Sequence, residues 1–244
     1  MSTSHSSIIK PAVRARVRAG VEPIARLFGR VGLTPNALTL IGFGIAVVAA
    51  WFATQELWLI AGLLVAFGAV FDLFDGALAR ATNQVSRLGA FMDSTFDRAG
   101  EAVVYIGIAA GFVAAQQEPG DGAVRLVRTI VHGDIGMLLA VAAMATSFMV
   151  SYTRAKSESL GFSSGTGMAN IGLAPREVRV LVLSVALIAA GLMTPSVPSP
   201  SAGPFEWFYL LAGGLALITV LATITTIQRI LFVYRQARNQ EVNE

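Results

Sequence analysis

The chain has 244 residues, of which 55% are hydrophobic and only 14% are charged, with a formal net charge of +3. This composition is far from that of a soluble domain and predicts a polytopic membrane protein. Cysteine is absent, which excludes disulfides and thiolate chemistry, and no apolar signal core opens the chain, so we expect no cleaved signal peptide.

Residues 1–31 form a polar tail followed by a basic segment in which apolar side chains recur near helical period. We predict an interfacial amphipathic helix that lies on anionic lipid, with arginines between its apolar positions. The alternative is a solvated basic leader that only sets topology. Pro11 and Pro23 divide any helix here into pieces.

Six stretches are apolar and close to the roughly 20 residues that span a bilayer. They cover residues 36–54, 57–79, 90–115, 135–156, 177–195 and 205–232. We therefore predict an all-α polytopic fold of six transmembrane helices. These helices form one membrane domain over residues 32–234, and a polar tail covers residues 235–244.

The distribution of basic residues predicts the orientation of these spans. Six spans place both termini on the same side of the membrane. Of the 18 Lys and Arg residues, only Arg125 and Arg128 fall in loops on the opposite side. The positive-inside rule therefore predicts a multi-pass protein of the cell membrane with both termini in the cytoplasm.

Four aspartates lie at the predicted cytoplasmic ends of the second and third spans: Asp72, Asp75, Asp93 and Asp97. A charged side chain at membrane depth costs roughly 2.5–3.5 kcal/mol on insertion scales, so such residues are rarely without function. Offsets of three and four residues place each pair on one helix face. Converging carboxylates repel one another, and all-oxygen ligation favours a divalent cation such as Mg²⁺ or Mn²⁺.

Small residues accompany the aspartates. Gly76 follows Asp75 inside a span, and Gly89 lies one turn before Asp93. Glycine in a helix interior is unfavourable by about 1 kcal/mol, so these positions suggest close approach of a phosphate-bearing ligand. Tight helix packing is the alternative explanation. Arg80 either contacts phosphate or only contributes to topology.

The full pattern is D-x2-D-G-x2-A-R-x8-G-x3-D-x3-D over residues 72–97, preceded by Gly-Leu-Thr-Pro-Asn-Ala-Leu-Thr-Leu at 32–40. At every fixed position it resembles the signature of the CDP-alcohol phosphotransferase family. The resemblance implies transfer of a phosphoalcohol group from a CDP-linked donor to an acceptor hydroxyl, with release of CMP. It also implies a Mg²⁺ or Mn²⁺ cofactor in a two-metal site and a homodimer.

Carried over by position, the resemblance implies roles for individual residues. Asp72, Asp75 and Asp93 would be metal ligands, and Asp97 would complete the metal site and act as general base. The residues expected to line the CDP site, besides Asp72, are Asn36, Thr39, Gly76, Ala79, Arg80 and Gly89. Stabilisation of charge on the leaving group and general-base help agree with this assignment.

Basic residues at the predicted cytoplasmic ends of the last three spans form a second constellation. Guanidinium groups bind phosphate through bidentate hydrogen bonds. These segments resemble the phosphatidylinositol-phosphate synthase branch of the family. That resemblance implies an acceptor-phosphate site made by Arg154, Arg179 and Arg229, with Arg176 beside it. The sequence departs from that branch at 161–175, which is several residues longer.

The leading hypothesis is therefore transfer of a phosphatidyl group from CDP-diacylglycerol to inositol 1-phosphate within the lipid bilayer. A rival in the same class uses glycerol 3-phosphate and makes phosphatidylglycerol phosphate, and other CDP-alcohol phosphotransferases stay possible. A rival from a different class is a cation transporter, because intramembrane acids often line ion paths. We expect no nucleic-acid partner.

Overall fold

The computed structural model describes residue 23 and residues 27–115, 133–162, 171–193 and 206–241. Six long helices account for most of these residues. They are α2 (Pro35–Thr54), α3 (Trp58–Ala81), α4 (Arg87–Ala115), α6 (Ile135–Ser159), α7 (Arg176–Met193) and α8 (Glu206–Glu241). Within the described ranges there is no strand, so the predicted all-α class is confirmed.

Five of the six helices are long and apolar enough to cross a membrane, which confirms a multi-pass membrane protein. The exception is α7, which has 18 residues and carries three charges in its first turn. A sixth span at α7 therefore stays a prediction. Most of the predicted interfacial helix and of the loop at 116–134, and all of the loop at 195–204, lie outside the described residues; of the interfacial segment, residues 27–30 are described and are helical.

Local sequence signals explain where the helices of the aspartate motif begin. Thr34 caps α2: its hydroxyl accepts a hydrogen bond from the Ala37 N–H at 3.2 Å, and Pro35 occupies the first helical position. Between α3 and α4, Asn83 adopts a positive φ of 55°, and the Ser86 hydroxyl accepts from the Gly89 N–H at 3.0 Å. This short, well-capped turn sets α3 and α4 side by side.

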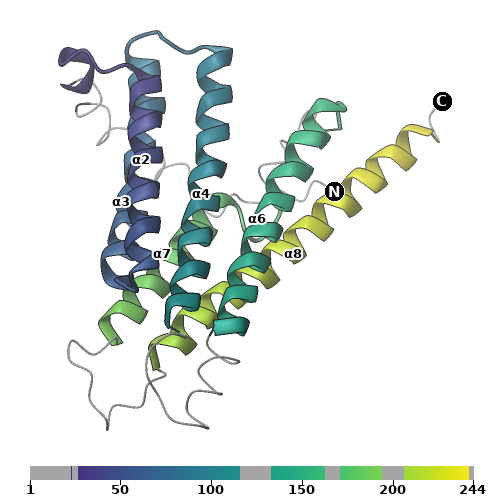
Figure 1. Cartoon of the computed structure of the whole chain (residues 1–244). Helices are drawn as coiled ribbons and strands as arrows, with labels where there is room; N and C mark the ends of the chain where they lie inside the picture. Colours follow the sequence, from purple (N-terminus) through teal and green to yellow (C-terminus); the bar gives the residue numbers. More distant parts are fainter. Residues whose placement is uncertain (1–22, 24–26, 116–132, 163–170, 194–205, 242–244) are drawn as a thin grey trace, which may run out of the picture.

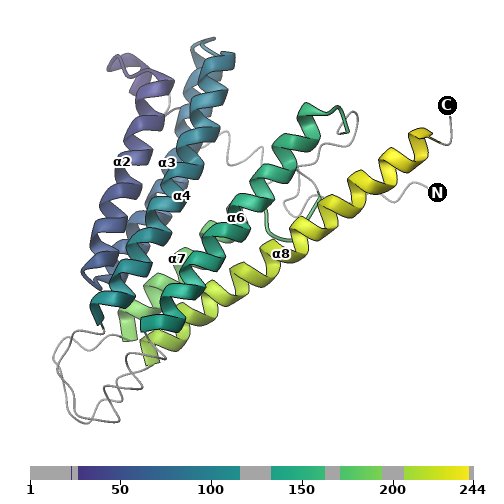
Figure 2. The ribbon, with the colours of Figure 1, turned by 45° about the vertical axis from the view of Figure 1, so that its right-hand side comes forward.

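The helices form two groups that diverge toward one end (Figures 1 and 2). Helix α2 packs against α3 and α4, whereas α8 packs against α6 and α7. Contacts of α3 with α7 and of α4 with α6 join the two groups. We call the end at which α3 ends and α4 begins the aspartate end. There α6 and α8 incline away from α2, α3 and α4.

The core of the bundle relies on small residues that let helix backbones approach closely. A Cβ atom added at Gly107 of α4 would lie 2.4 Å from the Ala50 carbonyl oxygen of α2. One added at Gly191 of α7 would lie 2.1 Å from the Leu59 backbone nitrogen of α3. These close contacts lie away from the aspartate end, where the two groups of helices diverge.

Candidate active site

The structure brings the four aspartates together at the aspartate end. Asp72 and Asp75 lie in the second half of α3, and Asp93 and Asp97 lie in the first half of α4. Their carboxylates are close enough for their charges to interact: Asp97 interacts with the other three, and Asp75 interacts with Asp93. As the spacing of the aspartates predicted, two helices together build one acidic cluster.

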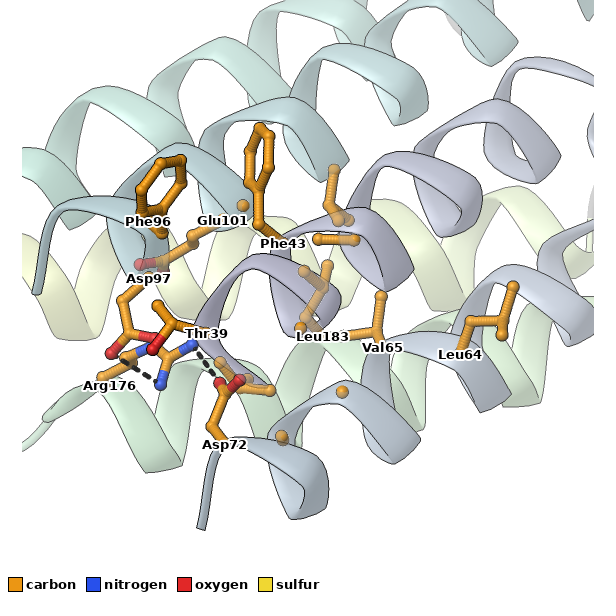
Figure 3. A pocket seen from close by; sticks show the side chains of 17 residues that line it. Thr39, Phe43, Leu64, Val65, Asp72, Phe96, Asp97, Glu101, Arg176 and Leu183 are labelled. Carbon is orange, nitrogen blue, oxygen red and sulfur yellow. Dashed lines mark hydrogen bonds and ion pairs between the residues drawn. The ribbon is translucent and has the colours of Figure 1, made fainter. Parts of the chain in front are cut away.

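Arg176, the first residue of α7, reaches into this cluster (Figure 3). Its Nη2 atom lies 2.7 Å from Oδ2 of Asp72, and its Nη1 atom lies 3.0 Å from Oδ2 of Asp97. One guanidinium thus bridges α3 and α4 and supplies positive charge between two of the four carboxylates. The sequence had placed Arg176 with the acceptor phosphate, and the structure places it on the aspartates.

Asp75 is the most buried of the four aspartates. The Thr39 hydroxyl donates to its Oδ2 atom at 3.0 Å, and the Gly76 N–H donates to its Oδ1 atom. Thr39 therefore lies against the acidic cluster, as expected for a residue of the same site. Gly42, one turn further along α2, faces Asp72: an added Cβ would come within 2.8 Å of Oδ1.

The other residues expected to bind CDP surround the cluster. Gly89 lies beside Asn36, because a Cβ atom added there would be 3.4 Å from the Asn36 Oδ1 atom. Gly76 likewise lies beside the Arg80 guanidinium. Ala79 is half-buried and Arg80 is exposed. All of them belong to the same end of α2, α3 and α4 as the aspartates.

The donor set suits a divalent metal. Among the described residues no three acidic or histidine side chains already converge as metal ligands do. However, four carboxylates offer only oxygen, the ligand that Mg²⁺ and Mn²⁺ prefer, and they have attracted a cationic group, Arg176. A metal site here requires small movements of the side chains and displacement of that guanidinium.

A second ion pair joins α4 and α7 next to the first. Arg179 Nε donates to Oε1 of Glu101 at 2.9 Å, and Nη2 donates to Oε2 at 2.8 Å. The side chains of Arg179 and Glu101 are only 2% and 8% exposed. Arg179 also donates to the Ala174 carbonyl at 3.0 Å. This predicted acceptor-phosphate residue is therefore fully engaged within the protein.

The sequence interpretation missed Glu101 and Gly42. Glu101 follows Asp97 by four residues and so repeats the spacing from Asp93 to Asp97 along α4. That spacing could have identified Glu101 as a further residue on the same face of α4. Gly42 had no comparable signal, because its role depends on the position of Asp72 across the α2–α3 contact.

Arg229 of α8 is 3% exposed and donates to two backbone carbonyls, those of Ile171 at 3.0 Å and Val150. Arg154 at the end of α6 is exposed and pairs with Glu158 at 2.9 Å. The charges of Arg154 and Arg179 both act on Arg229, and so does the opposite charge of Glu158. Arg154, Arg179 and Arg229 therefore form one group of guanidiniums, in which Arg154 and Arg179 already pair with Glu158 and Glu101. We call this group the arginine cluster.

The segment before α7 is fixed to α8. Thr225 is fully buried, and its hydroxyl accepts from the N–H groups of Leu173 and Ala174 at 3.0 and 2.9 Å. Gly172 has a φ of +119°, and an added Cβ would lie 2.1 Å from the Thr225 methyl group. Thr225 thus holds the residues that precede α7, and with them the start of α7 and Arg176, in place.

A cavity of about 60 Å³ lies between α2, α3, α4 and α7 (Figure 3). Charged and hydroxyl groups line its polar end, and aliphatic and aromatic side chains line the remainder. The polar group consists of Thr39, Asp72, Asp97, Glu101 and Arg176, and the apolar group includes Phe43, Leu64, Val65, Phe96 and Leu183. The cavity is thus lined by both members of the Arg176–Asp97 pair and by Glu101, the partner of Arg179.

A bundle of membrane helices with a cluster of four acids at one end defines an integral membrane protein with a site suited to divalent cations. The sequence profile of the CDP-alcohol phosphatidyltransferase family matches residues 32–235. The chain belongs to this family and is a phosphotransferase. This result supports an enzyme rather than a cation transporter.

Known relatives cover most of the chain. An archaetidylinositol phosphate synthase of Pyrococcus horikoshii is 32% identical over 218 residues, which are 89% of this chain and 93% of that protein. The phosphatidylinositol phosphate synthase PgsA1 of Mycobacterium tuberculosis with CDP-DAG bound is 26% identical, with a TM-score of 0.67, over 88% of this chain and 93% of that one. The same protein with manganese and citrate is 27% identical, with a TM-score of 0.67, over 88% of both chains.

Proposed function

We propose that this protein transfers a phosphatidyl group from CDP-diacylglycerol to the hydroxyl of inositol 1-phosphate and releases CMP. The observation that carries the proposal is the arginine cluster: the charges of Arg154 and Arg179 act on Arg229, and Arg229, unlike these two, donates to backbone carbonyls and has no carboxylate partner among the described residues. An anion relieves the repulsion between these positive charges, and the oxygens of a phosphate monoester can accept the paired hydrogen bonds that a guanidinium donates. The names of the relatives support inositol phosphate as that anion.

In this reaction the acceptor oxygen forms a bond to the donor phosphorus, and the bond from that phosphorus to the CMP oxygen breaks. Asp72, Asp75 and Asp93 would hold Mg²⁺ or Mn²⁺ in a two-metal site, which Asp97 would complete. When bound, the metals supply electrostatic stabilisation of the charge that develops on the pyrophosphate. Asp97 would also accept the proton of the acceptor hydroxyl, the role that the family resemblance implies for this position.

The small and polar residues around the cluster would hold the CDP group of the donor. Thr39 keeps the Asp75 carboxylate in a fixed orientation through its 3.0 Å hydrogen bond. Asn36 and Gly89 face each other, and Gly76 leaves space beside Arg80. Gly76, Gly89 and Ala79 allow a pyrophosphate to approach the backbone, and the exposed Arg80 guanidinium is placed to pair with it.

Membrane orientation follows from the same proposal. A water-soluble acceptor and the released CMP require that the aspartate end face the cytoplasm, which agrees with the positive-inside count. The protein would lie in the cell membrane with both termini inside. The predicted homodimer and the domain bounds of 32–234 complete the proposal and stay predictions.

The acceptor is the part of the proposal that most needs a test. Purified protein in lipid vesicles would be given CDP-diacylglycerol, Mn²⁺ and one labelled acceptor at a time. Inositol 1-phosphate is expected to support CMP release and labelled lipid. Robust transfer to glycerol 3-phosphate, without incorporation of inositol 1-phosphate, would instead identify the rival phosphatidylglycerol-phosphate synthase.

Replacing Arg229 by Ala tests the arginine cluster. We expect the KM for inositol 1-phosphate to rise by about tenfold or more, because a charge-assisted hydrogen bond contributes about 1.5–3 kcal/mol, whereas the KM for CDP-diacylglycerol should change little. Steady-state kinetics with each substrate varied in turn would measure both constants.

Because Arg229 is buried, the matched control is Arg229→Lys, which keeps a positive charge at the site. The Lys variant should fold and should recover part of the acceptor affinity. Equal increases in the two KM values of Arg229→Ala would argue against a role in acceptor binding and for a general distortion of the bundle.

A further inference from the structure

Two arginines of α7 reach α4 side by side, yet their surroundings differ. Arg176 and Arg179 are three residues apart, so they lie on one face of α7. Their partners on α4, Asp97 and Glu101, are four residues apart. The two pairs therefore form adjacent bridges between α7 and α4, and Arg176, Asp97 and Glu101 of these pairs line the cavity.

The Arg179–Glu101 bridge is fixed. Both side chains are almost completely buried, and the guanidinium binds both carboxylate oxygens and a backbone carbonyl. An uncompensated charge at this depth is strongly unfavourable, so neither partner leaves easily. This bridge holds the first turn of α7 against α4 and determines where Arg176 points.

The Arg176 bridge is much less complete. The Arg176 side chain is 35% exposed, and the side chains of its partners Asp72 and Asp97 are 20% and 22% exposed. Each carboxylate receives only one of its nitrogens, and Nε of Arg176 is buried without a hydrogen-bond partner among the described residues. Such a bridge is open to solvent and to competing ions.

The two carboxylates bound by Arg176 belong to the cluster that is assigned to metal. A divalent cation and this guanidinium would compete for the same oxygens, since both neutralise Asp72 and Asp97. We propose that Arg176 is an exchangeable counter-ion: it occupies the carboxylates while they lack metal, and divalent cation displaces it. The released guanidinium then becomes available to a substrate phosphate, while the Arg179–Glu101 bridge keeps it within reach.

This inference rests on the metal role in the proposed function, but not on the identity of the acceptor. Because Arg176 competes with metal for Asp72 and Asp97, it would lower the affinity of the enzyme for metal. In the absence of substrate, the enzyme would bind metal more weakly than the same four carboxylates would without Arg176. A phosphate that pairs with the released guanidinium would recover that difference. Metal and phosphate-bearing substrate would therefore promote each other's binding, by reciprocal linkage.

The test measures binding of Mn²⁺ alone to the purified full-length protein by electron paramagnetic resonance of the free ion. Arg176→Gln is expected to bind Mn²⁺ roughly ten- to a hundredfold more tightly than wild type, because the competing charge-assisted hydrogen bonds are lost. Arg176→Lys should show a smaller gain, since an ammonium group lacks the planar fork that bridges two carboxylates.

A thermal unfolding series on the same proteins gives a second readout. Without metal, Arg176→Gln should melt at a lower temperature than wild type, because its carboxylates repel without a counter-ion. Saturating Mn²⁺ should raise its melting temperature more than that of wild type. Arg235→Gln is the matched control: it removes an exposed positive charge of α8, and its Mn²⁺ affinity should equal that of wild type.

Unchanged or weaker Mn²⁺ binding by both Arg176 variants would overturn the inference and leave the metal role of the aspartates intact. Failure of the wild-type protein to bind Mn²⁺ would overturn both. If Arg176→Gln does not fold, the Lys variant carries the same comparison. An equal gain in Arg235→Gln would also refute the inference, because general surface charge would then explain the effect.

Discussion

Asp97→Asn is expected to lower the rate of CMP release by about 10²–10⁴-fold, the usual contribution of general acid–base catalysis, and further if metal binding is weakened. The amide has nearly the shape of the carboxylate, but it cannot accept a proton from the acceptor hydroxyl. Asp93→Asn should also abolish activity through loss of a metal ligand. Release of CMP from CDP-diacylglycerol, followed by chromatography, measures both variants.

The control for this experiment is an acid at the same end of the bundle and outside the cluster. Glu158→Gln removes an exposed carboxylate of α6 that pairs with Arg154, and CMP release should survive in this variant. All variants should elute from size-exclusion chromatography as wild type does. Retained activity in both aspartate variants would refute the metal and general-base assignments.

Glu101→Ala should lower the free energy of unfolding by about 3–5 kcal/mol, the usual result of removing one partner of a buried ion pair. Arg179 would keep its charge in a position that is 2% exposed, and the N–H groups that now bind Glu101 would have no acceptor. Unfolding titrated with denaturing detergent, in wild type and variant, measures the difference.

Two matched variants separate this effect from a general loss of contacts. The double variant Glu101→Gln with Arg179→Gln removes both charges and should be far more stable than Glu101→Ala, because no buried charge is left unpaired. Glu158→Ala breaks an exposed pair, in which the side chains are 45% and 42% exposed, and should cost at most about 1 kcal/mol. Equal losses in Glu101→Ala and Glu158→Ala would contradict the buried-pair argument.

The sequence was sufficient to predict the membrane fold because the signals are local. Apolar runs near bilayer length placed four of the five candidate spans within three residues of their helices, whereas α8 continues to Glu241, nine residues beyond the predicted end at 232. The aspartate cluster could be predicted from the sequence equally well. The spacing from Asp72 to Asp75 and from Asp93 to Asp97 fixes one face on each helix, and the short turn at 82–86 brings these faces together.

The contacts made by the arginines could not be predicted in the same way. Arg176 and Arg179 are neighbours in sequence with the same chemistry, and both suited an acceptor phosphate. Their difference arises from α4, which places the half-buried Asp97 against one and the buried Glu101 against the other. Burial and partner choice are set by tertiary packing, which helical periodicity does not encode.

The position of the aspartates along their helices has a consequence for the lipid itself. At about 1.5 Å per residue, Asp72 lies about 21 Å from the far end of α3, and Asp97 lies about 27 Å from the far end of α4. The hydrocarbon layer is about 30 Å thick, so with the far helix ends at the opposite boundary the carboxylates lie roughly 3–9 Å inside the near boundary, close to the lipid headgroups. A lipid phosphate can therefore react there while its chains stay in the bilayer. Extraction, which costs about 0.8 kcal/mol for each exposed CH₂ group, is never required.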